Sequence, residues 1–420
     1  VQPILTPLAV DAEHPFPFIS NLGLNLAVIL PDQENGNERF VRIKVPDNRP
    51  RWVHVPDGAG FVPLEQVISN NLDLMFPTPP RKVLQFRVTR AARGERARVG
   101  DLDPEDPLQT PGIIVEQVSA ELKARKFAGV VRLQVESSMP KKRLKWLIGQ
   151  LRVSNDDVYP LLSLGRTDDL LKFDATDRND LRLPPHKPAT HPRLRRLSES
   201  RPGAIFDEIR RGDILLHHPY HSFDTSVLKF LEAAAADPDV LAIKLTIYRT
   251  SAGSPIIRAL VDAARRGKQV AVQVEITARF DEAPNIAWGK LLEEEGVHVS
   301  YGVEKLKTHV KLALVVREER GALKRYLHVG TGNYHTGTAR VYEDVGLLTC
   351  DEDICSDAVA VFNALTGGTV HGDYRKLIVA PMTMRTRFKT LIEREAENAR
   401  AGRPSGIRAK MNQLQDPELI

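Results

Sequence analysis

Residues 305–342 read KLKTHVKLALVVREERGALKRYLHVGTGNYHTGTARVY. The pattern predicts a strand with one basic face, a second apolar strand, a glycine-rich turn and a basic segment that leads to Tyr342. Residues two apart on a strand share a face, so Lys307, His309 and Lys311 are expected to point the same way. Such a face is suited to binding an anion.

The residue types on this face suggest phosphoryl chemistry. A neutral imidazole, with an ordinary pKa of about 6.5, lets His309 offer a lone pair to an electrophile near neutral pH. The charge of Lys311 attracts the phosphate that this lone pair would attack. The glycines of the GTGN turn, residues 330–333, allow backbone N–H groups to approach phosphate oxygens, and Asn333 adds a side-chain donor. An isolated HxK motif is more often a solvated strand face, so these residues carry weight only as a group.

Upstream of this stretch, apolar strand patterns alternate with helical patterns. This alternation predicts an α/β domain with a mainly parallel sheet that is covered on both faces. Such sheets bind ligands at the C-terminal ends of their strands. The strands are expected at 213–220, 240–250, 269–276 and 297–302, and the helices at 225–236, 254–267 and 285–296.

Arg249 and Arg279 each follow one of these strands. A guanidinium donates a planar fork of hydrogen bonds, so phosphate is a natural partner for both. The alternative is that each one pairs with a nearby carboxylate, Arg279 with Asp281 or Glu282. Three phosphate-seeking elements on one sheet edge favour the first interpretation.

Two further pairs of neighbouring residues follow from strand geometry. Adjacent strand residues face opposite ways, so His217 and His218 cannot both line the site, and one is expected to be structural. Glu343 and Asp344 also face opposite ways, so one of them could accept a hydrogen bond from the far nitrogen of His309 and so fix its tautomer; Asp344 is the one expected to do so. The alternative is that Asp344 pairs with Arg340.

The chain has 420 residues and a net charge of +5. Its basic residues are spread along the chain, which favours a polyanionic ligand and not a nucleic-acid-binding arm. No apolar run reaches the ~18 residues that a membrane span needs. Cys350 and Cys355 are too few for a disulfide framework and are expected to be free thiols.

A basic, proline-rich segment at 182–203 separates regions with different patterns. The predicted organisation is an α+β head domain over 1–195, an α/β domain over 196–376, and the start of another α/β domain over 377–420, with a strand near 407–414. The chain begins without Met. It is therefore interpreted as a piece of a longer protein.

A series of motifs along the whole chain is specific in its order: HPFPFISNLGLNLAV, HHPY, IYRTSAGSPI, KTHVKLALVVR, HVGTGN and ARVYEDVGLLT. The series closely resembles bacterial polyphosphate kinase of the large, histidine-phosphorylated type, whose catalytic domains are similar in fold to phospholipase D. The resemblance implies that His309 is phosphorylated by the γ-phosphate of ATP, or by a polyphosphate end in the reverse reaction. It implies that Tyr342 contacts the nucleotide, and that Arg249 and Arg279 lie at a magnesium-triphosphate site, where we expect them to contact phosphate oxygens beside the ion.

The same resemblance makes 196–376 the first phospholipase D-like catalytic domain and 377–420 the start of a truncated second one. It implies Mg²⁺ as cofactor, ATP, ADP and inorganic polyphosphate as ligands, and a homo-oligomer, either a dimer or a tetramer. Charge distribution and hydropathy predict no nucleic-acid partner and no transmembrane segment. The resemblance implies a cytoplasmic location, with peripheral membrane association as an alternative. Family members have a domain before Val1 and a second α/β domain beyond Ile420 that supplies another essential His and Arg. This fragment alone is therefore expected to be inactive or nearly so.

The sequence departs from the family pattern at four positions, where Leu245, Thr277, His221 and His335 replace Gln, Lys, an acidic residue and Asn. Losing a Lys at Thr277 is expected to weaken phosphate binding. Two rival functions remain open. A phospholipase D-like phosphodiesterase needs two HxK motifs and an acid where Val316 stands, and the chain has neither. The other rival is a non-catalytic polyanion-binding protein.

Overall fold

The fold was examined in a computed structural model, which describes residues 2–11, 14–31, 38–56, 60–91, 115–116, 118–120, 122, 127–170, 179–197, 201–250, 253–276, 282–302, 306–367, 373–411 and 413–420. Arg279 and Thr277 lie outside these ranges. The chain divides into two compact units, one made of Val1–Pro111 and Glu116–Pro185, the other of Gly112–Val115 and His186–Ile420. Within the described ranges, no helix is long and apolar enough to cross a membrane.

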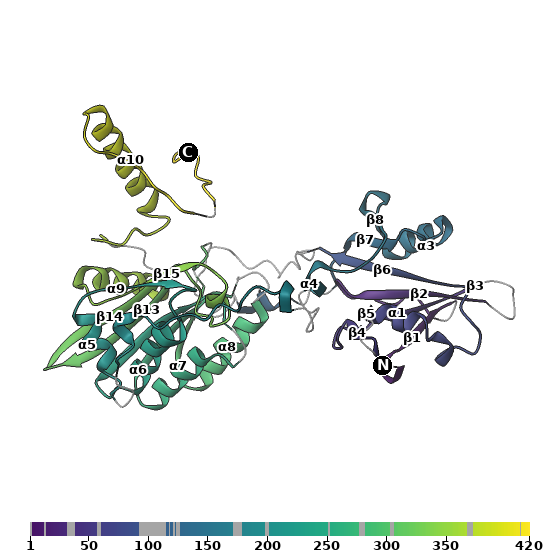
Figure 1. The fold of residues 1–420 in the computed structure, drawn as a ribbon, viewed down its shortest axis with the longest axis horizontal. Coiled ribbons are helices and arrows are strands. Elements are labelled where there is room, and N and C mark those ends of the chain that lie inside the picture. Colours follow the sequence, from purple (N-terminus) through teal and green to yellow (C-terminus); the bar gives the residue numbers. More distant parts are fainter. Residues whose placement is uncertain are drawn as a thin grey trace, which may run out of the picture. The chain divides into compact units, whose positions relative to one another are not determined.

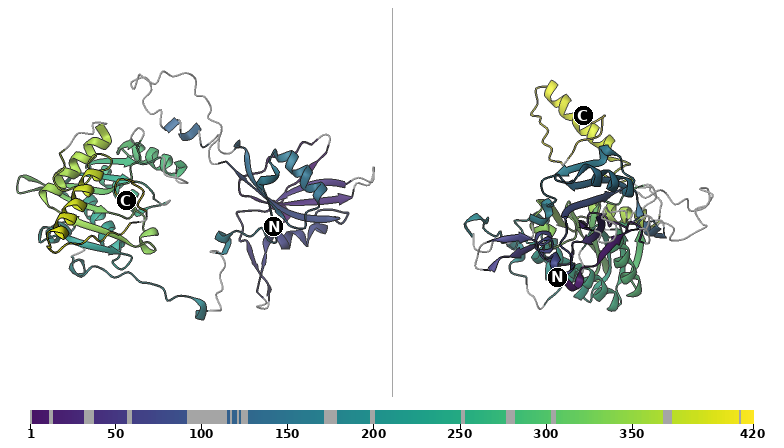
Figure 2. Two further views of the ribbon diagram at one scale, coloured as in Figure 1. Left: turned by 90° about the horizontal axis from the view of Figure 1, so that it is seen from above. Right: turned by 90° about the vertical axis from the view of Figure 1, so that its right-hand side faces the viewer.

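The first unit is built on a six-stranded sheet in the order β1-β3-β2-β6-β7-β8, which Figure 2 shows as a twisted fan. Side chains alternate across β2, so Ala27 packs with α3 on one face and Leu26 with α1 on the other. The unit has the predicted α+β content. Its main elements are β1 (Pro7–Val10), β2 (Leu24–Pro31), β3 (Glu38–Lys44), β4 (Trp52–His54), β5 (Phe61–Pro63), α1 (Leu64–Ser69), β6 (Lys82–Arg90), β7 (Val130–Glu136), α3 (Lys141–Leu151), β8 (Val158–Leu161) and α4 (Thr167–Leu170).

The second unit is built on a seven-stranded sheet in the order β12-β11-β10-β13-β14-β15-β9. Its long continuous part begins at His186, whose ring Nε2 bonds to the carbonyl oxygen of Pro219 at 3.0 Å. Its elements are α5 (Ala204–Arg210), β9 (Ile214–His218), a π-helix η7 (Asp224–Leu228), α6 (Lys229–Ala236), β10 (Val240–Ile247), α7 (Pro255–Arg265), β11 (Gln269–Val274), α8 (Glu282–Glu294), β12 (His298–Tyr301), β13 (Lys311–Glu319), β14 (Ala322–Gly330), β15 (Asp344–Thr349), α9 (Glu352–Gly367) and α10 (Met384–Arg400).

The prediction of a mainly parallel sheet is wrong. Strand β11 is parallel to β10 and to β12, but the other four strand pairings are antiparallel. Arg320 and Gly321, with φ of 51° and 80°, join β13 to β14. Positive φ at both central residues is the geometry of a tight hairpin turn, which forces the two strands to run in opposite directions.

Helices cover both faces of this mixed sheet (Figure 1). Leu312, Leu314 and Leu327 pack against α9 on one face. Tyr326 packs against Phe206 of α5 on the other. By strand alternation this second face also carries Lys311.

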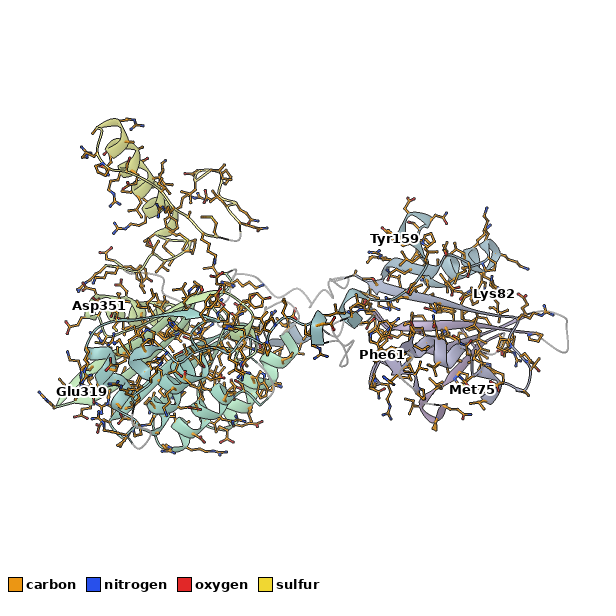
Figure 3. All side chains as sticks on the ribbon, viewed as in Figure 1. Phe61, Met75, Lys82, Tyr159, Glu319 and Asp351 are labelled. Carbon is orange, nitrogen blue, oxygen red and sulfur yellow. The ribbon has the colours of Figure 1, made fainter. Side chains whose placement is uncertain are left out.

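The strand registers bring several strand ends to one edge of the sheet. Lys311, at the start of β13, pairs with Gly330 at the end of β14, and Asp344, at the start of β15, pairs with His218 at the end of β9. The C-terminal ends of β10 and β11 lie at the same edge. Glu319, labelled in Figure 3, ends β13 at the opposite edge. The candidate residues described by the structure therefore gather along the first edge.

Candidate active site

His309 lies in the segment just before β13, with its ring exposed and packed edge-on against Tyr248 at a centroid distance of 5.0 Å. Burial lowers the pKa of His309, and the charges of Lys311 and Lys307 lower it further, while Glu275 opposes them. The imidazole is therefore mainly neutral at neutral pH, with a lone pair available on a ring nitrogen.

The backbone on both sides of His309 is held by side chains from neighbouring strands. Glu275, buried directly after β11, accepts a hydrogen bond from the N–H of Thr308 at 2.7 Å. Thr246 Oγ1 donates to the carbonyl oxygen of Val310 at 2.8 Å and accepts from the N–H of Leu312 at 3.0 Å. These contacts replace the regular strand ladder at this point.

Lys311 is only 3% exposed. Its ammonium lies 4.9 Å from the centroid of the Tyr248 ring and donates to the carbonyl oxygen of His309. Burial lowers the pKa of Lys311 to about 8, against the attraction of Asp344. No carboxylate in the described part of the chain is hydrogen-bonded to this ammonium, so its charge is available to an anion.

The prediction that Lys307, His309 and Lys311 share one face of a strand is wrong. The strand begins only at Lys311, which is buried, whereas Lys307 and His309 are exposed. The physical reason is the Thr246 hydroxyl, which takes the place of a strand partner beside Val310. His309 is thereby released from the pleat and turned outward next to the buried lysine.

The structure does not join Asp344 to His309. The carboxylate of Asp344 accepts from the hydroxyl of Thr331 at 2.8 Å, and no hydrogen bond between Asp344 and His309 occurs in the described chain. Glu275 is the acid whose charge acts on His309. Sequence reasoning missed Glu275, although a carboxylate immediately after an apolar strand was a visible signal.

The remaining candidates follow other strand ends. Arg249 is half-buried and lies two residues beyond β10. Its neighbour Tyr248 is another residue that sequence reasoning missed. Asn333 follows β14 with its Oδ1 atom buried, and Tyr342 precedes β15 with 62% of its surface exposed. Because Arg279 lies outside the described residues, only Arg249 of the predicted arginine pair is placed at this edge.

Three of the four departures from the family pattern have local contacts. Leu245 is a buried core residue of β10. The ring of His221 accepts from the N–H of His217 at 3.1 Å through Nδ1, and the ring of His335 accepts from the N–H of Thr338 at 3.0 Å in the same way. Both imidazoles therefore support their own turns.

The predicted contrast between the adjacent histidines is confirmed: His217 is exposed and His218 is buried. Across the described ranges, no group of three or more His, Cys, Asp or Glu side chains is placed to hold a metal ion. Magnesium commonly binds through one or two carboxylates and substrate phosphates. The described residues therefore do not form a dedicated metal cage.

Three models of polyphosphate kinase domains match the chain: the middle domain over residues 1–173, C-terminal domain 1 over 204–371 and C-terminal domain 2 over 377–420. Polyphosphate kinase from Thermosynechococcus vestitus is 45% identical over 100% of this chain and 60% of the relative. The enzyme of that name from Streptomyces coelicolor is 46% identical over 100% of this chain and 55% of the relative.

Among solved structures, the crystal structure of polyphosphate kinase from Porphyromonas gingivalis superposes with a TM-score of 0.73 and 27% identity, over 96% of this chain and 57% of that one. The chain thus spans less than two thirds of the length of these relatives. The three domain models follow one another in order along the sequence. The chain belongs to the polyphosphate kinase family.

Proposed function

We propose that the protein containing this chain transfers the γ-phosphate of ATP to inorganic polyphosphate, reversibly, through a phosphohistidine at His309. The observation that carries the proposal is the pairing of an exposed, mainly neutral imidazole with a buried ammonium to which no carboxylate of the described residues is bonded. Phosphoryl transfer depends mostly on positioning and on neutralising charge, and this edge of the sheet offers both.

The reaction is balanced in two steps. A ring nitrogen of His309 attacks the γ-phosphorus, a P–N bond forms, the bond to the bridging oxygen breaks, and ADP leaves with the electron pair. A terminal oxygen of polyphosphate then attacks the same phosphorus, and the P–N bond breaks to restore the imidazole. Run in reverse, the steps make ATP from polyphosphate and ADP.

The side chains around His309 have separate tasks in this scheme. Lys311 holds the oxygens of the transferred group by its charge, because its ammonium lies buried beside the nucleophile. Tyr248 fixes the distance between the imidazole and the ammonium by touching both. Arg249, Arg279 and Asn333 are proposed to contact phosphate oxygens, and Tyr342 the nucleotide. A magnesium ion bound to the ATP phosphates would reduce their negative charge, and Arg249 and Arg279 would contact the phosphate oxygens beside it.

The experiment is labelling of the full-length protein with γ-labelled ATP and magnesium, comparing the unmodified protein with His309→Ala and with His298→Ala as a matched control. His298 is an exposed histidine at the start of β12, at the opposite edge of the sheet. Label that is acid-labile, alkali-stable, lost in His309→Ala and kept in His298→Ala supports the proposal. Polyphosphate binding without any label on His309 would favour a non-catalytic polyanion-binding protein, and nucleotide-independent release of alcohol from a phosphodiester would favour the phospholipase D-like rival.

A further inference from the structure

A second polar cluster lies beneath the same edge of the sheet. His328 of β14 is two residues before Gly330, the partner of Lys311, and His218 of β9 pairs directly with Asp344. Strand alternation puts the side chains of Lys311, His328, His218 and Asp344 on one face of the sheet. His218 and His328 are 4% and 3% exposed, so both imidazoles are inside the protein.

Three of these side chains, together with Asn333, line a small cavity. Its lining includes His218, His328, Asn333 and Asp344, and its volume is about 10 Å³. A cavity of roughly 10–15 Å³ on this measure holds one water molecule. Glycine at 346 makes the arrangement possible, since a Cβ there would lie 2.7 Å from Nε2 of His328.

The tautomer of His218 follows from its partner. Nδ1 of His218 lies 2.7 Å from the carbonyl oxygen of His221. A carbonyl can only accept, so Nδ1 carries the proton and donates. Burial lowers the pKa of His218, against the hydrogen bond to His221, so the ring is neutral at neutral pH. Its Nε2 atom, which is buried with no partner in the described chain, therefore presents a lone pair.

The tautomer of His328 is set by Tyr334. Nδ1 of His328 lies 2.9 Å from the Tyr334 hydroxyl, which has no other partner in the described residues. Burial lowers the pKa of His328 to about 3, so this ring is neutral too. When the hydroxyl donates to Nδ1, both groups use their hydrogen-bonding capacity and the ring proton is left on Nε2. Nε2 of His328 is also buried without a partner in the described chain.

Asn333 provides the third buried atom, since its Oδ1 has no partner within the described ranges. One donor, Nε2–H of His328, and two acceptors, Nε2 of His218 and Oδ1 of Asn333, thus border a cavity of one-water size. A water molecule accepts one such bond and donates two, so it satisfies all three atoms. A metal ion fits poorly, because the protonated nitrogen of His328 has no lone pair to give.

We propose that one buried water bridges His218, His328 and Asn333, and that the two histidines are positioning residues for the Asn333 amide. With Oδ1 held inward by the water, Nδ2 is directed away from the cavity. This last step rests on the proposed function: the amide nitrogen then faces the edge where the transferred phosphate binds.

The water and both tautomers can be tested without turnover. A crystal structure of the full-length protein at about 1.5 Å is expected to show one water within about 3.2 Å of the three atoms. Nitrogen-15 NMR of the imidazoles is expected to show the Nδ1–H tautomer for His218 and the Nε2–H tautomer for His328. A dry cavity, or the opposite tautomer at either ring, would overturn the proposal whether or not the protein transfers phosphate.

The positioning role is tested by kinetics of paired variants. His328→Leu removes the Nε2–H that donates to the proposed water. The Asn333 amide then loses its orientation toward the phosphate, so the KM for the phosphate substrate is expected to rise about tenfold with a smaller change in kcat. His328→Gln, whose amide nitrogen can replace Nε2–H, is expected to restore most of the loss. Tyr326→Phe is the control. It deletes a hydroxyl on the same face of β14 that is bonded to Glu319, and it should leave KM unchanged. Equal KM values for the Leu and Gln variants would contradict the role.

Discussion

A cation lies near each end of strand β13, and the two have opposite surroundings: Arg317 is partly buried and Lys311 is buried. At one end, Arg317 is bonded to Asp237, Asp239 and Glu319 at 3.0, 2.7 and 2.9 Å. Burial acts to lower its pKa, but the hydrogen bonds with Asp237 and Glu319 outweigh burial, so the pKa is raised. At the other end, the Lys311 ammonium contacts a backbone carbonyl and an aromatic ring, with no carboxylate hydrogen-bonded to it among the described residues. Burial lowers its pKa to about 8, against the attraction of Asp344.

Under the proposed function, the difference separates a structural charge, Arg317, from a charge that binds a ligand, Lys311. The carboxylates around Arg317 leave it no capacity for an anion, and it holds the hairpin end in place. Burial of the Lys311 ammonium costs free energy that its neighbours offset only slightly. Such a cost is expected where a bound phosphate supplies the opposite charge. The following variants test this contrast in the full-length protein.

The largest effect is expected for His309→Ala. Loss of the attacking nitrogen removes the covalent route, so ATP-dependent polyphosphate synthesis should fall by about 10⁴-fold or more. The measurement is initial rate by ADP release together with polyphosphate yield. Activity within tenfold of the unmodified protein would mean that another group accepts the phosphate.

Lys311→Met is expected to lower kcat/KM by about 10³-fold, because charge on the transferred group is no longer neutralised. Stability should not fall. The pKa of Lys311 in the folded protein, about 8, is lower than its ordinary value in the unfolded chain. The unfolded state therefore binds more protons, and below pH 8 the charged lysine opposes folding. Thermal unfolding at pH 7 checks this point; a large drop in Tm would make Lys311 a structural residue like Arg317.

Arg317→Ala should have the reverse profile. Removing it leaves the buried carboxylate of Asp237 without its partner, which is expected to cost about 3 kcal/mol of unfolding free energy. The kcat per folded molecule should stay within about twofold, because Arg317 lies at the edge away from His309. Denaturant unfolding and active-site-normalised rates give the two numbers, and a selective loss of kcat would refute the contrast.

The smallest effect is a shift in pH dependence. The rate is expected to decline above about pH 8 as Lys311 loses its proton, and to persist below pH 6.5 because the pKa of His309 is lowered. Lys311→Arg keeps its charge at high pH, so the alkaline limb should move upward even if the maximum is reduced. An alkaline limb unchanged in this variant would assign it to a different group.

Sequence reasoning located most strands and helices of the second unit, because apolar runs and helical spacing are local signals. Strand direction is not local, and the mainly parallel sheet was wrong for that reason. The sequence did contain a signal for the antiparallel direction. Only Arg320 and Gly321 join β13 to β14, and a connection of this length allows a hairpin but not the crossover that parallel strands need. The strand expected near 407–414 is absent from the described residues of that range.

The candidate site was predictable by residue type but not by geometry. His309, Lys311, Arg249 and Asn333 do follow or precede strands at one edge. Periodicity placed His309 and Lys311 on one face, yet the Thr246 hydroxyl interrupts the strand and separates an exposed ring from a buried amine. Tyr248 was missed because an aromatic residue at a strand end has no pattern that distinguishes it from the core.

Gly330 and Gly346 lie opposite each other on adjacent strands, and a methyl group at 346 would come within 2.7 Å of the His328 ring. Substitutions at positions 328 and 346 are therefore expected to be tolerated in one order only. A lineage that enlarges residue 346 must first shrink or lose the imidazole at 328, so the two positions should show strong epistasis in any library that varies both.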